Sequence, residues 1–294
     1  MSLRNVLGQQ KAVEILLNEV KNNNIKHSYI FYGIKGIGKK FTAFQFAKSI
    51  LCNNTKDGLS CDICDICNKI DERIHPDVVL VDFDFQQQLF GKKEATSISI
   101  DTIRYIKEIS ILTSYEGGYK IFIIDQAETL QKEAANSLLK LLEEPPQKCV
   151  FILVVSMLGA LPKTVISRCE LIKFFPLNNL ILKQISKNEI CKESMFGSIE
   201  EIDFIKKVPQ NFKFENINEI QQMIDNLPQD KDFIKYFFIR LTEDFIFNKY
   251  NCCEDHNKFL EEIEFFLKNF RYNIEYKLLL ETFLLRYNTL CNSD

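Results

Sequence analysis

A glycine-rich stretch, GIKGIGKK at residues 33–40, has the spacing of a loop that binds phosphate groups. It fits the pattern G-x-x-x-x-G-K through Gly33, Gly38 and Lys39, and Gly36 adds a further glycine. Glycines let the backbone turn its N–H groups onto phosphate oxygens, and the lysine reaches the outer phosphates. The stretch therefore predicts a nucleotide-binding loop, and a plain glycine turn between a strand and a helix is the alternative.

The residues that would complete ATP hydrolysis depart from the usual pattern. Lys40 stands where such loops place serine or threonine, and an ammonium group repels the magnesium ion that a hydroxyl would coordinate. Asp125 ends an apolar segment and is suited to hold magnesium, but it is followed by Gln126, whose amide cannot act as a base. Ser156 ends another apolar segment. We expect a degenerate nucleotide site, at which binding of ATP or ADP remains open.

Four of the ten cysteines are close together in the sequence, in the pattern C-x8-C-x2-C-x2-C. They are Cys52, Cys61, Cys64 and Cys67. Four thiolates at short spacing can surround a zinc ion tetrahedrally, and a closed four-sulfur shell leaves no position for catalysis. We predict a structural zinc ion at this cluster. An iron–sulfur cluster and four free thiols are the alternatives.

Apolar segments that alternate with helical patterns must position these residues. The expected strands are residues 27–33, 77–83, 120–128, 149–156 and 170–175. Helical periodicity is found at residues 8–24, 39–52, 99–114 and 130–144. This alternation predicts an α/β fold with a parallel five-stranded sheet and helices on both faces, in which ligands bind at the carboxyl ends of the strands. The loop, Asp125 and Ser156 all fall at such ends. Beyond Pro176 only helical patterns remain.

Composition excludes several classes of protein. The chain has 294 residues, 46% of them hydrophobic, and a net charge of −3, which argues against nucleic-acid binding over the whole surface. A zinc-dependent DNA-binding protein is also disfavoured, because acidic residues flank the cysteines. Neither a signal-like N-terminus nor an apolar run of membrane-spanning length is present, so we expect a cytoplasmic protein without membrane contact.

Several stretches together resemble the AAA+ subunits of the bacterial sliding-clamp loader. They are the loop at 33–40, the cysteine insert, HPDV at 75–78, KIFIIDQAETLQKEAANSLLKLLEEPP at 120–146 and VISRCE at 165–170. Within this family the chain resembles the delta-prime subunits of DNA polymerase III. The resemblance implies an AAA+ P-loop domain at 1–175 with a zinc module at 52–67, a helical lid at 176–207 and an all-α collar domain at 208–294.

The resemblance also implies partners and a role. Members of this family form a hetero-pentameric ring of gamma or tau motor subunits, delta and delta-prime, which uses ATP to place the sliding clamp on primed DNA. The arginine of the Ser-Arg-Cys motif, here Arg168, would project into the ATP site of a neighbouring subunit. Motor subunits carry an arginine in the lid where this chain has Glu200. We therefore expect a non-hydrolysing subunit, and an ATP-hydrolysing motor subunit is the alternative.

Overall fold

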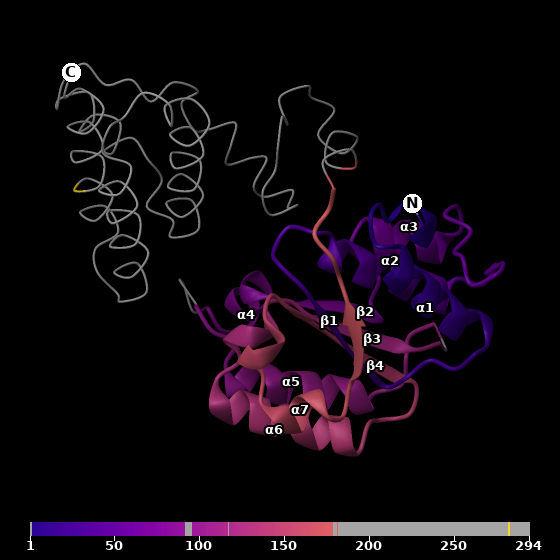
Figure 1. The fold of residues 1–294 in the computed structure, drawn as a ribbon. Coiled ribbons are helices and arrows are strands. Elements are labelled where there is room, and N and C mark those ends of the chain that lie inside the picture. Colours follow the sequence, from indigo (N-terminus) through magenta and orange to yellow (C-terminus); the bar gives the residue numbers. More distant parts are fainter. Residues whose placement is uncertain (1, 92–95, 117, 179–180, 182–281, 283–294) are drawn as a thin grey trace, which may run out of the picture. The chain divides into compact units, whose positions relative to one another are not determined.

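The computed structural model of the chain describes residues 2–91, 96–116, 118–178, 181 and 282 (Figure 1). These residues fold around a five-stranded sheet with the order β2-β3-β4-β1-β5. The strands are β1 (Ser28–Tyr32), β2 (Val78–Val81), β3 (Lys120–Ile124), β4 (Cys149–Val155) and β5 (Glu170–Lys173). Every neighbouring pair is parallel, which confirms the predicted sheet.

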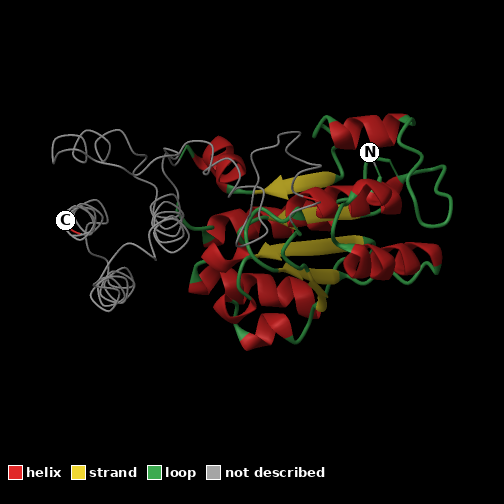
Figure 2. Ribbon diagram, turned by 45° about the horizontal axis from the view of Figure 1, so that its top comes forward, coloured by secondary structure: helices red, strands yellow, loops and turns green. Residues whose placement is uncertain are grey.

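Helices cover both faces of the sheet, as the alternating pattern predicts. They are α1 (Gln10–Lys21), α2 (Lys39–Leu51), α3 (Asp65–Asp71), α4 (Phe83–Phe90), α5 (Ile100–Ile111), α6 (Lys132–Glu143) and α7 (Lys163–Ile166). Figures 1 and 2 show α1, α2 and α3 on one face and α5, α6 and α7 on the other. Among the described residues, no helix has both the length and the apolar character needed to cross a membrane.

The central strands are apolar apart from their first residues in β1 and β3, Ser28 and Lys120, because both of their faces are buried. In β1, Tyr29 and Phe31 point towards α2, and the ring centroids of Tyr29 and Phe46 lie 5.2 Å apart. Ile30 lies between them in sequence and faces the opposite core, which α5 and α6 cover. On that side Phe122 of β3 stacks on Phe151 of β4, with ring centroids 5.3 Å apart. Two hydrophobic cores therefore hold the helices against the sheet.

The second strand is shorter than its sequence suggests. The expected segment was 77–83, whereas β2 covers only Val78–Val81. The carboxylate of Asp82 accepts a hydrogen bond of 2.9 Å from the backbone N–H of Phe85 and thereby begins α4, which the sequence pattern did not predict. A short acidic side chain after an apolar run can cap a helix as readily as it can extend a strand.

Most of the predicted C-terminal organisation lies outside the described residues. The expected lid at 176–207 and the collar at 208–294 include only residues 176–178, 181 and 282 of the part that the structure describes. Glu200, which we expected at the position of a lid arginine, also lies outside it, so that expectation stays a prediction. The division into three domains therefore stays a prediction.

Gly33 is required by the packing of β1 against β5. Its φ angle is +149°, a value that residues with side chains rarely adopt. A Cβ atom at this position would lie 2.5 Å from the backbone oxygen of Phe174, which directly follows β5. Because the obstructing atom belongs to the backbone, no side-chain rotation can relieve the clash.

We predict that Gly33→Ala lowers the free energy of unfolding by more than about 1 kcal/mol, because alanine meets both the unfavourable φ angle and the clash. Urea unfolding followed by circular dichroism measures this loss. Gly159→Ala is the matched control, since a Cβ at Gly159 would meet no atom within 4 Å and its φ angle is ordinary. Equal stability of the two variants would contradict the prediction.

Candidate nucleotide-binding and metal-binding sites

The glycine loop joins the end of β1 to the start of α2. Gly36 and Gly38 have φ angles of +71° and +90°, and Gly38 directly precedes the first residue of the helix. A Cβ atom built on Gly38 would meet nothing within 4 Å, so space is open in front of the helix N-terminus. The loop thus presents a glycine backbone and a helix N-terminus at the carboxyl edge of the sheet, as phosphate binding requires.

Lys39 folds back over its own loop. Its ammonium group donates hydrogen bonds to the backbone oxygens of Gly33, at 2.6 Å, and Ile34, at 2.5 Å, and the residue is buried. These carbonyl groups replace the water that the charge would otherwise bind. To reach a bound phosphate, the Lys39 side chain would have to exchange these carbonyl contacts for phosphate oxygens.

Lys40 forms an ion pair with Asp125. The Nζ atom of Lys40 lies 2.8 Å from Oδ2 of Asp125, whose side chain is only 12% exposed. The other carboxylate oxygen, Oδ1, accepts a 3.0 Å hydrogen bond from the backbone N–H of Gln126. The carboxylate suited to hold magnesium is therefore paired with an ammonium group. Thr42 does not replace the missing hydroxyl, because its buried Oγ1 donates to the backbone oxygen of Gly38 at 2.8 Å.

Glu128 connects the ends of β3 and β4 at the edge of the sheet next to Asp125. Gln126 adopts a left-handed turn (φ 49°, ψ 44°) that leads from β3 into a short 3₁₀ helix, Ala127–Thr129. From this helix Oε1 of Glu128 accepts a 3.1 Å hydrogen bond from the backbone N–H of Ser156, at the end of β4. Its Oε2 is buried without a hydrogen-bond partner among the described residues. Glu128 thus links the ends of two neighbouring strands, which its place in the sequence did not reveal.

The structure brings the predicted nucleotide residues together at one edge. The loop follows β1, Asp125 and Gln126 follow β3, and Ser156 follows β4. These three strands are neighbours in the order β3-β4-β1, and their carboxyl ends share an edge because all of them run in parallel. Nucleotides are expected to bind at this edge in sheets of this type.

Arg168 lies at the opposite edge. Its backbone oxygen accepts a 2.7 Å hydrogen bond from Oγ of Ser28, the first residue of β1, whereas the glycine loop follows Tyr32 at the other end of that strand. A strand of this length spans about 16 Å at roughly 3.3 Å per residue. Arg168 is therefore too far away to contact a nucleotide held by the loop of its own chain.

The guanidinium group of Arg168 is held in a defined position. Nη2 lies 2.7 Å from Oε1 of Glu143, the last residue of α6, and Nη1 donates a 2.8 Å hydrogen bond to the backbone oxygen of Thr164. The Arg168 side chain remains 35% exposed. Sequence reasoning missed Glu143 as its partner, because nothing in their spacing places the end of α6 beside residue 168.

The four clustered cysteines converge in space. Cys52 follows α2, Cys64 precedes α3 and Cys67 lies within α3, and all four sulfur atoms, including that of Cys61, lie within 4.8 Å of one another. The Sγ atoms of Cys52 and Cys64 are 4.0 Å apart, and none of the four forms a disulfide bond. Tetrahedral zinc with Zn–S bonds of about 2.3 Å requires sulfur atoms roughly 3.8 Å apart. The cluster therefore fits a metal ion.

The protonation of these thiols depends on their surroundings. The backbone N–H of Ile63 stabilises the thiolate of Cys61 and lowers its pKa to about 6. Burial raises the pKa of Cys52 and Cys67. Bound metal would have to displace protons from these two buried thiols.

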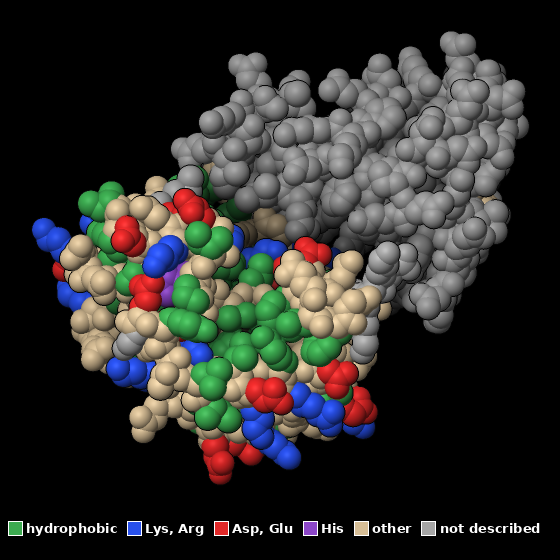
Figure 3. Space-filling model, turned by 180° about the vertical axis from the view of Figure 1, so that it is seen from behind, with side chains coloured by type: hydrophobic (Ala, Val, Ile, Leu, Met, Phe, Trp, Pro, Cys, Tyr) green, Lys and Arg blue, Asp and Glu red, His purple; other side chains and the backbone are tan. Residues whose placement is uncertain are grey.

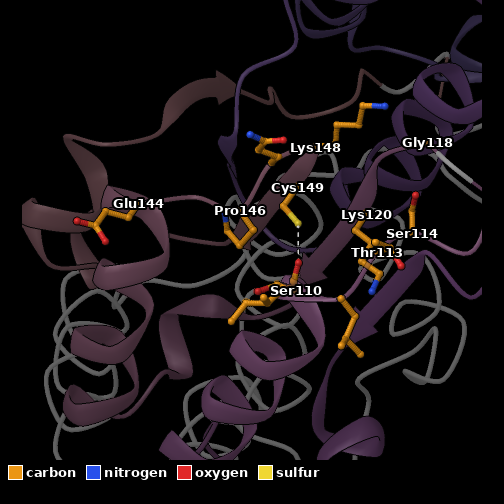
Figure 4. Close-up of a pocket in the computed structure, with 12 residues that line it drawn as sticks. Ser110, Thr113, Ser114, Gly118, Lys120, Glu144, Pro146, Lys148 and Cys149 are labelled. Atoms are coloured by element: carbon orange, nitrogen blue, oxygen red, sulfur yellow. Dashed lines mark hydrogen bonds between the residues drawn. The ribbon is translucent and has the colours of Figure 1, made fainter.

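A cavity of about 740 Å³ lies at the amino edge of the sheet, where Lys120 begins β3 and Cys149 begins β4. Figure 4 shows the Sγ atom of Cys149 hydrogen-bonded to the backbone oxygen of Ser110, at 3.3 Å. Neither the glycine loop nor Asp125 lines this cavity, so it is separate from the candidate nucleotide site.

Apolar side chains are exposed close to this cavity. Ile111 and Leu112, which line it, and the nearby Tyr115 are each more than 60% exposed. Figure 3 shows a face of the molecule on which hydrophobic side chains gather among charged ones. Exposed apolar groups of this kind commonly mark contact surfaces.

The fold is similar to that of a solved structure. A DNA polymerase III, gamma subunit-related protein from Thermotoga maritima superposes with a TM-score of 0.50 at 16% identity, covering 96% of this chain and 99% of that chain. At this level of identity the likeness shows the fold alone.

Curated relatives are DNA polymerase III subunits. Subunit gamma of Buchnera aphidicola subsp. Baizongia pistaciae is 31% identical over 224 residues, which are 76% of this chain and 57% of the relative. Subunit delta' of Bacillus subtilis is 34% identical over 170 residues, 58% of this chain and 48% of the relative. Subunit tau of Bacillus subtilis is 33% identical over 169 residues, which are 58% of this chain and 28% of the relative. The chain thus matches about half the length of the gamma and delta' relatives.

A family model described as "DNA polymerase III, delta subunit" matches residues 8–178, more than half of the chain and nearly all of its described part. On the strength of this match, the chain belongs to the DNA polymerase III delta-subunit family.

Proposed function

We propose that this chain is a delta-prime-type subunit of a DNA polymerase III clamp loader that does not hydrolyse ATP itself. In this role it joins gamma or tau motor subunits and a delta subunit in a ring that places the sliding clamp on primed DNA in the cytoplasm. The observation that carries the proposal is the ion pair of Lys40 with Asp125, at 2.8 Å.

This ion pair opposes magnesium binding in two ways. Magnesium binds oxygen ligands in a near-ideal octahedron, and Lys40 offers none. Its ammonium group also occupies one side of the carboxylate that would hold the ion and repels a second cation there. Gln126, next to Asp125, has no carboxylate to activate water. The loop can therefore hold ATP or ADP only without the usual metal, and the chemical step lacks support.

The position of Arg168 supports a role in a neighbouring site. It lies at the amino edge of the sheet, away from its own loop, with a partly exposed guanidinium group that Glu143 and Thr164 orient. A guanidinium supplied by a neighbour stabilises charge on a transferring phosphoryl group. Exposed apolar side chains at the same edge, Ile111 and Leu112, suit a surface that a second chain covers.

A motor subunit is the second candidate, because several relatives are named gamma or tau. A motor would need an oxygen ligand at position 40 and a base beside Asp125. This chain has Lys40 and Gln126 at these positions. The two candidates differ in one measurable property, which is ATP turnover by the chain itself.

We also propose that the four clustered cysteines hold a structural zinc ion. Four sulfur ligands complete the tetrahedral shell, so the ion would stabilise the insert between α2 and α3 without taking part in catalysis. Because Cys52 follows α2, zinc binding would fix the C-terminal end of this helix against the cysteine insert. The same helix begins at the glycine loop.

The first prediction concerns Lys40. The purified chain should show no magnesium-dependent ATP turnover above background. Lys40→Thr should bind ATP at least about tenfold more tightly with magnesium than without it, because Asp125 and a hydroxyl become available to the ion. Binding of a fluorescent ATP analogue measures both affinities. Lys40→Met separates loss of the ammonium group from gain of the hydroxyl. Rapid ATP turnover by the unchanged chain, lost in Lys39→Ala, would instead show that the chain is a motor subunit.

The second prediction concerns Arg168. In a reconstituted clamp loader, Arg168→Ala should leave assembly intact and reduce ATP turnover at the adjacent site by about 10³-fold or more. Arg168→Lys should not restore the rate, because an ammonium group lacks the two-pronged guanidinium geometry. The matched control is Arg104→Ala, which removes an exposed arginine that pairs with Asp101 on α5. Turnover equal to that of the control would refute the role in trans.

The third prediction concerns the metal. Elemental analysis of the purified chain should find one zinc ion per molecule, and Cys64→Ser should lose most of it because the tetrahedral shell becomes incomplete. Cys149→Ser is the matched control, since Cys149 is buried but lies outside the cluster. Stoichiometric iron with visible absorption would show an iron–sulfur cluster instead.

A further inference from the structure

A buried lysine joins the cysteine insert to α2. Lys48 lies on α2, one helical turn before Cys52, and its side chain is completely buried. Its Nζ atom lies 2.9 Å from Oδ1 of Asp62 and 2.6 Å from Oδ2 of Asp71. A lysine is almost never buried completely unless it is paired. The two carboxylates therefore offset the free-energy penalty of removing the ammonium group from water.

The two carboxylates lie on either side of the cysteines. Asp62 directly follows Cys61, and Asp71 ends α3, the helix that contains Cys67. One ammonium group on α2 therefore contacts both the turn that presents Cys61 and the helix that presents Cys67. A third ligand, Cys52, follows the same helix as Lys48.

The turn at Asp62 is held by its side-chain contacts. Its φ angle is +62°, a left-handed conformation that aspartate adopts more readily than most residues. Oδ1 of Asp62 also accepts a 2.8 Å hydrogen bond from Oγ of Ser60, so the side chain is fixed from two directions. These contacts hold the Asp62 side chain, and with it the neighbouring Cys61, in place.

Lys48 also offsets negative charge at the insert. Four thiolates outweigh the charge of one zinc ion, and two nearby carboxylates add to the negative charge. Burial alone would lower the pKa of Lys48, but its hydrogen bonds to Asp71 and Asp62 more than offset this effect and keep the group protonated. Without Lys48 the two carboxylates would repel each other and the thiolates.

We propose that Lys48 is the positioning residue of the metal site, because its contacts with Asp62 and Asp71 bring the cysteine sulfurs together before metal binds. This inference rests on the proposed zinc site. Lys48 does not touch the metal itself. Its contacts lower the free energy needed to close the insert around the ion. The affinity for metal therefore depends on Lys48.

The test is metal binding by the full-length chain after its metal has been removed. Cobalt(II) titration reports thiolate coordination through visible absorption, and zinc competition with a chromogenic chelator gives the affinity. Lys48→Met should weaken zinc binding by about 10- to 100-fold, as is typical for loss of groups that orient metal ligands. At saturating cobalt its spectrum should still be that of four thiolates.

The matched control is Lys69→Met. Lys69 also pairs with a carboxylate, at 2.6 Å from Glu116, and it lies on α3, but its side chain is 42% exposed and the pair does not join the insert to α2. Its loss should change zinc affinity by less than about twofold, because exposed ion pairs contribute little. Equal affinities of Lys48→Met and Lys69→Met would overturn the positioning role.

A second variant decides the matter if Lys48→Met does not fold. Asp62→Asn keeps an acceptor for Ser60 but removes the charge that pairs with Lys48. Positioning predicts weaker zinc binding by Asp62→Asn. Unchanged or tighter binding, as expected if Lys48 only offsets negative charge, would overturn the proposal. Failure of the unchanged chain to bind cobalt or zinc would instead refute the metal site itself, and the role of Lys48 with it.

Discussion

The parallel pairing of β3, β4, β1 and β5 determines at which edge of the sheet the candidate nucleotide residues and Arg168 lie. Because all strands run in the same direction, their carboxyl ends form one edge of the sheet and their amino ends form the other. The glycine loop, Asp125 and Ser156 share the first edge, whereas Arg168 lies at the second. In the proposed clamp loader, this arrangement would place the nucleotide edge and the arginine at opposite sides of the subunit.

Helix α2 connects the two candidate sites, and each of its three lysines contacts oxygen atoms of the protein. Lys39 is bound by carbonyl groups of its own loop, Lys40 by Asp125, and Lys48 by Asp62 and Asp71. Lys40 occupies one side of the Asp125 carboxylate, and Lys48 contacts carboxylates on both sides of Cys64 in the cysteine insert. Charge pairing thus holds both ends of α2, while apolar side chains such as Phe44 and Phe46 bury its middle.

The glycine loop has a structural role of its own. Gly33 is required by packing, because any side chain at this position would meet the backbone of Phe174. The geometry of this part of the loop is therefore required by the junction of β1 with β5. Glu128 acts similarly at the same edge, where it joins the ends of β3 and β4 through Ser156. Contacts that belong to the fold thus maintain the shape of this edge.

Local patterns in the sequence were sufficient to predict the five strands and the glycine loop. The spacing of the four cysteines likewise predicted that their sulfur atoms converge, and the lysine at position 40 is visible in the sequence itself. Each depends on residues that are close together in the chain, where periodicity and spacing translate directly into geometry. The ends of β2 and β3 were predicted less well. Asp82 caps a helix instead of extending β2, and the strand expected at 120–128 ends at Ile124 because Gln126 turns the chain into a 3₁₀ helix.

Only the tertiary structure decided which charges meet. Lys40 pairs with Asp125, and Arg168 with Glu143, because the strand order β2-β3-β4-β1-β5 brings distant segments together. Strand order follows from how helices and strands pack, and the spacing of residues along the chain does not encode it.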